Sequence, residues 1–112
     1  MNIIITGRHL ELTEPIRKHA QTLLADFFAD KANLKVSSIR VILEHEHQLG
    51  KVEILVSMKN HEVLSRSEDQ DLYKAINQAV DRMAAQITRH LTKVREHQAP
   101  ATRDVEAIFN PA

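Results

Sequence analysis

Residues 52–67 decide the fold, with the sequence VEILVSMKNHEVLSRS. Apolar side chains recur at every second position from Val52 to Met58, a period typical of a half-buried β-strand. The alternation resumes after Asn60 and His61. These two residues are predicted to form the turn, because asparagine tolerates the positive φ that a two-residue turn needs. The stretch therefore predicts a β-hairpin.

Two segments upstream of this hairpin also predict strands. The period of two begins at Ser37 and runs to a turn expected at residues 48–51, which include Gly50. Residues 2–6 form a short run rich in β-branched side chains, which Gly7 is expected to end. The sheet should thus have four strands, with one face in the core and one face nearer to solvent.

Two amphipathic helices complete the pattern. The first is predicted at residues 13–29, with Thr13 as its N-cap, and the second from about residue 71 to about residue 97. Each has a single apolar stripe, so both should cover the same face of the sheet. The expected side chains of the core are those of Ile39, Val41, Ile54, Val56, Ile76, Val80, Met83 and Ile87.

The predicted fold class is therefore α+β, a two-layer β-α-β-β-β-α sandwich with a four-stranded sheet and two helices on one face. The folded domain is expected to span residues 1–97. Residues 98–112 contain Pro100 and Pro111 and have little periodicity, so they are predicted to form a flexible C-terminal tail.

Composition excludes several classes of function. The 112 residues include no cysteine, which removes disulfides, thiolate nucleophiles and cysteine-type zinc sites. No apolar run approaches the roughly 20 residues of a membrane span, and the N-terminus lacks the pattern of a signal peptide. A cytoplasmic protein without a membrane partner is expected.

Catalytic and metal-binding patterns are weak. With two glycines in the chain, no glycine-rich phosphate loop is present in the sequence, and no nucleophile motif is found. His45 and His47 have the spacing of a transition-metal chelate, but the remaining ligands of such a site are missing from the pattern. We expect a binding protein that is not an enzyme and that needs no cofactor or metal.

The charges are balanced overall but unevenly distributed. The chain has 15 basic and 15 acidic side chains, which by itself argues against a nucleic-acid-binding domain. Residues 36–70 carry four basic and six acidic side chains, whereas residues 71–97 carry five basic and three acidic ones. The second helix is therefore the most cationic element of the sequence.

The basic residues of this helix follow a line. Arg82, Arg89 and Lys93 have spacings of seven and four, which place them on one line, predicted to lie nearly opposite the apolar stripe. Lys74 should fall on the same outer side, and Arg95 adds charge at the C-terminal turn. An ordinary solvated face is the plain alternative, but scarce acidic partners at i+4 favour binding to phosphates.

The first helix offers a second group of cations. Arg17 and Lys18 lie outside its apolar stripe and would extend a basic surface if the two helices are neighbours. Scattered surface charge explains each of them equally well.

One segment of the second helix resembles a known family. Residues 68–77, EDQDLYKAIN, resemble the E-D/G-x-D-M/L-Y-x-A-I-D/N motif of ribosome hibernation promoting factors and of the related ribosome-associated inhibitor. Residues 5–7, 11–14 and 16–17 resemble the opening of these proteins, and QITRH at residues 86–90 continues the match. The resemblance covers residues 1 to about 97, and the nearly neutral tail, with one basic and two acidic side chains, is similar to that of a short hibernation promoting factor.

This resemblance implies a fold similar to a double-stranded-RNA-binding domain and a site on the small ribosomal subunit, in the channel for tRNA and mRNA. It implies silencing of translation in stationary phase or stress, and ribosome dimerisation together with a second modulation factor. It also implies rRNA contacts by basic residues of the helices. Leu23, Ala85 and Leu91 depart from the pattern, because relatives often carry lysine or arginine there. The residues that match basic family positions are Arg17, Arg82, Arg89, Lys93 and Arg95.

Two alternatives stay open at this point. An inhibitor-type relative would silence single ribosomes without dimerising them. A protein that does not bind RNA could form homodimers through the outer sheet face, where alternation places Ile42, Leu55 and Leu64. Salt separates RNA binding from apolar dimerisation, since only the former weakens steeply as salt rises.

Overall fold

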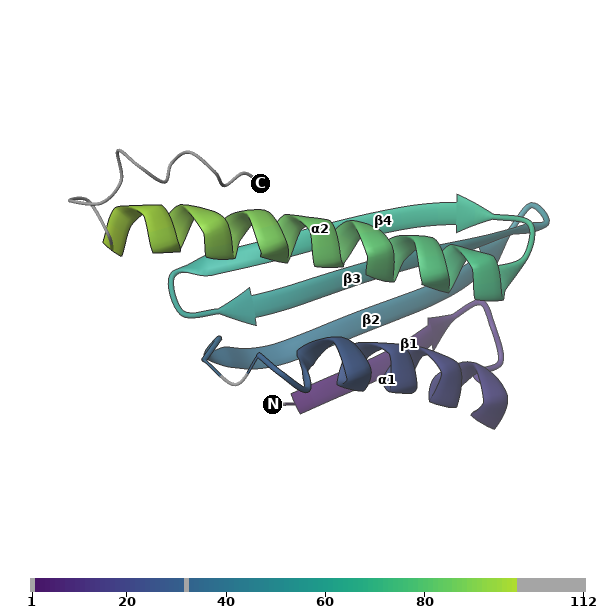
Figure 1. Ribbon diagram of the computed structural model, residues 1–112. Helices are drawn as coiled ribbons and strands as arrows, with labels where there is room; N and C mark the ends of the chain where they lie inside the picture. The colour runs from purple at the N-terminus through teal and green to yellow at the C-terminus, as the bar shows by residue number, and fades with distance from the viewer. Residues whose placement is uncertain (1, 32, 99–112) are drawn as a thin grey trace.

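The computed structural model describes residues 2–31 and 33–98, with side chains of the last helix up to Leu91. Figure 1 shows six elements in the predicted β-α-β-β-β-α order. The sheet order is β1-β2-β3-β4; β1 and β2 are parallel and the other neighbours antiparallel. The elements are β1 (Asn2–Arg8), α1 (Glu14–Phe28), β2 (Val36–Glu46), β3 (Leu49–Met58), β4 (His61–Asp69) and α2 (Leu72–Gln98).

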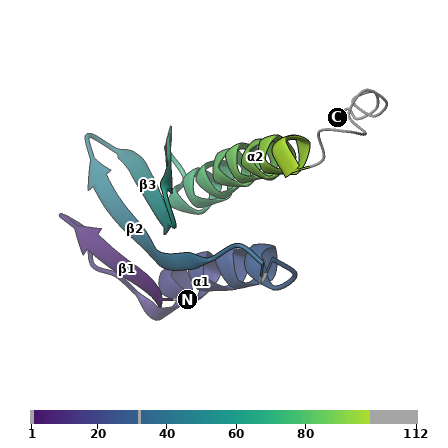
Figure 2. The ribbon, with the colours of Figure 1, turned by 90° about the vertical axis from the view of Figure 1, so that its left-hand side faces the viewer.

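Both helices pack on the same face of the sheet, as predicted, and leave the other face open (Figure 2). β1 and β4 point in the same direction, and each is followed by a helix, so α1 and α2 begin at the same end of the sheet (Figure 1). The two helices form what we call the helical layer. The opposite side of the sheet is called the outer face.

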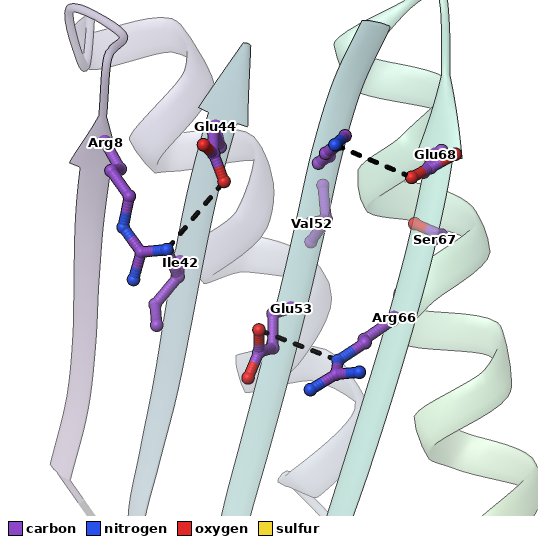
Figure 3. A pocket seen from close by; sticks show the side chains of 9 residues that line it. Arg8, Ile42, Glu44, Val52, Glu53, Arg66, Ser67 and Glu68 are labelled. Atoms are coloured by element: carbon purple, nitrogen blue, oxygen red, sulfur yellow. Dashed lines mark ion pairs between the residues drawn. The ribbon is translucent and has the colours of Figure 1, made fainter. Parts of the chain in front are cut away.

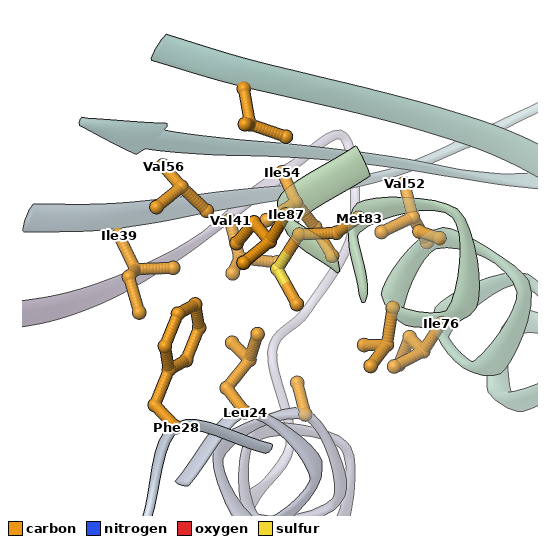
Figure 4. Close-up of a cluster of buried hydrophobic side chains, with 14 of the residues drawn as sticks. Leu24, Phe28, Ile39, Val41, Val52, Ile54, Val56, Ile76, Met83 and Ile87 are labelled. Atoms are coloured by element: carbon orange, nitrogen blue, oxygen red, sulfur yellow. The ribbon is translucent and has the colours of Figure 1, made fainter. Parts of the chain in front are cut away.

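The core lies between the helical layer and the sheet (Figure 4). All eight side chains that the sequence assigned to the core are at most 7% exposed, which confirms the predicted register of the strands. Two buried hydroxyl groups fix α2 on β4: Ser65 Oγ donates to Ala79 O at 2.7 Å, and Ser67 Oγ donates to Ala75 O. The domain thus holds α2 both by apolar packing and by hydrogen bonds.

The turn between β2 and β3 differs from the prediction. His47 and Gln48 form it, with φ values of 52° and 63°, whereas Gly50 lies within β3. A Cβ atom on Gly50 would meet Leu72 Cδ1 at 2.9 Å. The glycine is therefore required by the close approach of α2, and the prediction of a glycine-containing turn at residues 48–51 is wrong.

Two other boundaries shift. Lys59 and Asn60 form the turn after β3, with Asn60 at a φ of 62°, while His61 already pairs with Met58 as the first residue of β4. The turn was predicted one residue too late. β1 also continues through Gly7, which pairs with β2.

A capping side chain lies at the start of each helix, and that of α1 is the predicted Thr13. Thr13 Oγ1 accepts a hydrogen bond from Ile16 N at 3.5 Å, and Asp71 Oδ1 accepts one from Tyr73 N at 2.9 Å. Both helices agree with their predicted bounds to within one residue at each end. The predicted tail, apart from its first residue, lies outside the described residues.

Candidate nucleic-acid interface

The helical layer and the sheet differ in charge. Among residues 14–28 and 72–91, the helices carry five basic and three acidic side chains. The four strands carry four basic and six acidic ones. The zero net charge of the chain therefore conceals a cationic layer on an acidic sheet. The basic residues of the helical layer with described side chains are Arg17, Lys18, Lys74, Arg82 and Arg89.

Three of these cations are exposed and have no ion pair with any side chain that the structure describes, namely Lys18, Lys74 and Arg89. Arg17 Nε lies 3.7 Å from Glu14 Oε1, but both side chains are largely exposed. Such a surface pair is weak and is easily exchanged for another anion. Three cations of the layer are thus free to bind phosphates, and Arg17 has a weak surface pair of the same kind as those of Arg8 and Arg66 on the sheet.

Arg82 has a different position from the one predicted. Its Nη1 donates to Arg66 O on β4, and Gln86 Nε2 donates to Leu64 O at 2.9 Å. Arg82 therefore lies on the flank of α2 that faces the free edge of the sheet, and the prediction that it lies nearly opposite the apolar stripe is wrong. At about 100° per residue, Arg89 follows on the same flank.

The two side chains also cover carbonyl groups of an edge strand. Unpaired backbone groups of such a strand invite pairing with another chain. Arg82 and Gln86 thus protect β4, while the remaining N–H groups of the Arg82 guanidinium are free to bind anions.

Lys74 lies eight residues before Arg82, so its side chain is rotated about 80° around the helix from that of Arg82 and points outward.

The cations of α1 also spread out. Arg17 and His19 are two residues apart and so project from nearly opposite sides of the helix. His19 faces α2, because its Nε2 hydrogen-bonds Asn77 Oδ1 at 2.8 Å. Arg17 is consequently on the flank away from α2, and Lys18 points outward between these two directions. The helices are neighbours, as the extended basic surface requires, but the cations span the whole layer instead of one line.

An aromatic contact lies at the seam between the two helices. The rings of His19 and Tyr73 meet edge to face, with centroids 5.1 Å apart and planes at 75°. Tyr73 is 40% exposed. The sequence interpretation did not single out either residue. One feature of the sequence could have pointed to Tyr73: it is the chain's sole tyrosine and is followed by Lys74 in the cationic helix.

Three of the four cations on the outer face of the sheet are paired (Figure 3), whereas the fourth, Arg40, is exposed and has no ion pair with a described side chain. Arg8 Nη1 lies 3.8 Å from Glu44 Oε1, and Arg66 Nε lies 3.7 Å from Glu53 Oε1. Together with neighbouring side chains they line a shallow hollow across the four strands. Acidic and basic groups alternate there, so the hollow offers no surplus of either charge to a ligand.

A third cation of this face is paired twice. Lys51 Nζ lies 3.0 Å from Glu46 Oε1 and 3.9 Å from Glu68 Oε2. The hydrogen bond and charge of Lys51 hold the pKa of Glu46 below its ordinary value of 4.5, and Glu46 raises the pKa of Lys51 above 10.5 in return. Both groups therefore stay charged near neutral pH.

Three further points concern metal ligands, membrane spans and the last turns of α2. No group of three or more possible metal ligands occurs among the described residues, His45 and His47 included. No helix within the described ranges is long and apolar enough to cross a membrane. The side chains of Lys93 and Arg95, on the last turns of α2, lie outside the described residues.

Solved structures share this architecture. A ribosomal subunit interface protein from Coxiella burnetii matches with a TM-score of 0.76 over 82% of this chain and 99% of that protein, at 17% identity. The N-terminal domain of Protein Y from Thermus thermophilus matches with a TM-score of 0.72 over 80% and 99%, at 34% identity. The fold is thus that of the ribosomal subunit interface proteins.

Sequence comparison identifies the family. Residues 3–95 match the family described as Sigma 54 modulation protein / S30EA ribosomal protein, and the chain belongs to it. The ribosome hibernation promoting factor of Salmonella typhimurium is 29% identical over 97 residues, which are 87% of this chain and 100% of that factor. The factor of Pseudomonas putida is 30% identical over 93 residues, or 83% and 89%. The resemblance found in the sequence is confirmed.

Proposed function

We propose that the chain is a ribosome hibernation factor, which binds the small ribosomal subunit in the channel for tRNA and mRNA and stops translation in stationary phase or stress. The observation that carries this proposal is the difference in charge between the two layers: the helices have a surplus of cations, three of them without an ion pair among the described side chains, whereas the strands have a surplus of carboxylates and three of their four cations are paired. Membership of the family and the names of the relatives give its direction. The protein would act in the cytoplasm.

The proposed interface is the helical layer. Ribosomal RNA is recognised largely through its phosphates, its 2′-hydroxyls and its shape. Cations spread over two neighbouring helices suit such a surface, because the phosphates of folded RNA lie along several directions. The residues proposed to contact rRNA are Arg17, Lys18, Lys74, Arg82, Arg89, Lys93 and Arg95.

In this proposal the protein acts by occupancy. A domain seated in the channel excludes tRNA and mRNA, so translation stops without any chemical step. No small-molecule substrate or catalytic group is needed, and the protein is proposed not to be an enzyme.

We propose that bound ribosomes dimerise with the help of a second modulation factor. The tail at residues 98–112 is the segment in which this function and that of an inhibitor-type relative would differ. The domain at residues 1–97 is proposed to bind without the tail. A chain that ends at His97 should then fold and bind the small subunit like the full chain, as measured by circular dichroism and co-sedimentation.

The same truncation also tests the fate of the ribosomes. If the tail is a passenger, dimers form equally with both chains on sucrose gradients; if it obstructs dimerisation, the truncated chain gives more dimers. Loss of subunit binding on truncation contradicts both versions and makes the tail part of the interface.

The homodimer alternative rests on the outer face. Leu64 is 43% exposed and pairs directly with Leu55 across β3 and β4. Charged residues surround this pair, so the apolar area is small for a stable dimer. Sedimentation of the free protein at low and high salt tests this alternative, since an apolar dimer would persist at high salt.

The central experiment is co-sedimentation with ribosomes from growing and from starved cells. We expect the protein to sediment with small subunits and with whole ribosomes from starved cells. It should be released from them as the salt concentration rises. Absence from ribosomal fractions at low salt would contradict the proposed function.

A further inference from the structure

The geometry points to a base-stacking site in the helical layer: Tyr73, supported by His19, would bind one unpaired nucleobase of rRNA between the outward-pointing Lys18 and Lys74. This inference rests on the proposed function and adds to it a contact with a base. Contacts of the cations described above with phosphates carry no direct information on sequence.

The exposure of Tyr73 is the first argument. Three large apolar side chains are exposed among the described residues. Two of them, Ile4 and Leu64, lie on the outer face of the sheet, and Tyr73 is the third. Tyr73 lies on the first turn of α2, at the end of the cationic layer where both helices begin, and the residue is 40% exposed. An exposed aromatic side chain beside cations is the arrangement that proteins use to stack the bases of single-stranded nucleic acids.

The second argument is the support of the ring. In an edge-to-face pair, one ring offers its edge to the face of the other, so His19 covers at most one of the two faces of Tyr73. His19 is itself held by its hydrogen bond of 2.8 Å to Asn77. The platform is therefore positioned by contacts across the two helices before a base arrives, which lowers the entropy that binding must cost.

The third argument is the position of the flanking charges. Lys18 directly precedes His19, and Lys74 directly follows Tyr73. One residue is about 100° on an α-helix, so each lysine points outward, one on either side of the seam. The nearest carboxylate along the chain, that of Asp71, accepts the backbone hydrogen bond of Tyr73. A nucleotide on the ring would thus have a lysine beside the phosphates that precede and follow it.

The affinity of three variants for purified small subunits tests the site. Tyr73→Ala should weaken binding roughly 5- to 100-fold, which is the effect of losing one stacked base. The factor should be the same at every salt concentration, because no phosphate contact is lost. Tyr73→Phe keeps the ring and should bind like the unaltered protein. Leu64→Ala removes an equally exposed apolar side chain from the outer face and should also change nothing.

A second measurement needs no substitution. The chain has one tyrosine and no tryptophan, so tyrosine fluorescence reports on Tyr73 alone. A single-stranded adenosine hexanucleotide at low salt should quench this emission on binding, whereas polyphosphate, which has charge but no base, should not. This measurement stands even if Tyr73→Ala is found to unfold.

The outcomes separate this inference from the proposed function. If the unaltered protein binds subunits and Tyr73→Ala binds equally well, or if the hexanucleotide and polyphosphate quench alike, stacking is refuted and the proposed function stands. If Tyr73→Phe loses as much affinity as Tyr73→Ala, the ring is not the binding group. If the unaltered protein does not bind subunits, the proposed function fails, and the inference that Tyr73 stacks on a base of rRNA fails with it.

Discussion

The outer face of the sheet and the helical layer carry almost the same number of cations but use them differently. On the sheet, Arg8, Lys51 and Arg66 each lie within 4 Å of a carboxylate. On the helices, Lys18 and Lys74 have no such partner among the described side chains. A polyanion must compete with ion pairs at three of the four cations of the sheet, Arg40 being the exception, whereas it meets free ammonium groups on the helices. The pairing of charges is thus more informative than their sum.

The largest test of this contrast removes three cations from one face at a time. In the helical variant, Lys18, Lys74 and Arg89 are each replaced by glutamine. We expect affinity for the small subunit to fall at least about tenfold, and the slope of log affinity against log salt to fall by roughly two to three units, since each phosphate contact contributes about one. Filter binding over a range of salt concentrations measures both quantities, and the melting temperature should hardly change.

The matched variant replaces Arg8, Lys51 and Arg66 by glutamine. It loses the same three charges, so any loss of long-range attraction is equal. We expect the affinity to stay within roughly threefold of the unaltered protein and the salt slope to be unchanged. Equal losses in the two variants would show that net charge alone matters and would remove the helical layer as the interface.

Sequence periodicity predicted the fold well because it reports burial directly. The period of two from Val52 to Met58 and the stripe of α2 depend on which side chains leave water, and the structure buries the predicted ones. Gly50 was misinterpreted for a physical reason. A glycine required by the approach of Leu72 looks the same in a sequence as a glycine required by a turn.

The candidate site was less predictable, because it depends on contacts between distant elements. Helical spacing gives the angle between Arg82 and Arg89 but not which flank meets the edge of β4. The pairing of His19 with Tyr73 joins residues 54 positions apart, and no local pattern indicates it. Spacing predicts which residues share a side of one helix, and the packing of two helices decides what that side faces.

A gain of charge on the helical layer should strengthen RNA binding. Ala85 is exposed on α2, within the helical layer that is proposed to face rRNA. Ala85→Lys should raise the affinity for the small subunit a few-fold and steepen the salt slope by about one unit, because one phosphate contact is gained. Binding measured at two or more salt concentrations gives both values.

The control for this gain is Thr6→Lys, which adds the same charge to an exposed position of β1 on the outer face. It should leave the slope unchanged. A steeper slope with Thr6→Lys and none with Ala85→Lys would mean that the sheet, and not the helical layer, faces the RNA.

The smallest expected effect concerns the ion pairs of the outer face. Because Lys51 lowers the pKa of Glu46, their pairing stabilises the folded protein above the ordinary carboxyl pKa of 4.5, and this contribution is lost as the pH falls through the lower pKa of the folded state. Because Glu46 raises the pKa of Lys51, the contribution is complete below 10.5 and is lost only as the pH rises through the higher folded-state value. Both groups are exposed, so the effect is slight.

Between these limits the pairing should therefore be constant. We expect Lys51→Gln to melt slightly below the unaltered protein by the same margin from about pH 5 to about pH 9, and the margin to shrink at lower pH as Glu46 takes up a proton. Thermal unfolding of both proteins at a series of pH values measures it. A margin that persists undiminished in acid would mean that Lys51 stabilises the sheet by packing and not by its ion pair with Glu46. Ion pairing would then not explain why the outer face does not bind RNA. The contrast between the two faces would then have to rest on the helical layer alone.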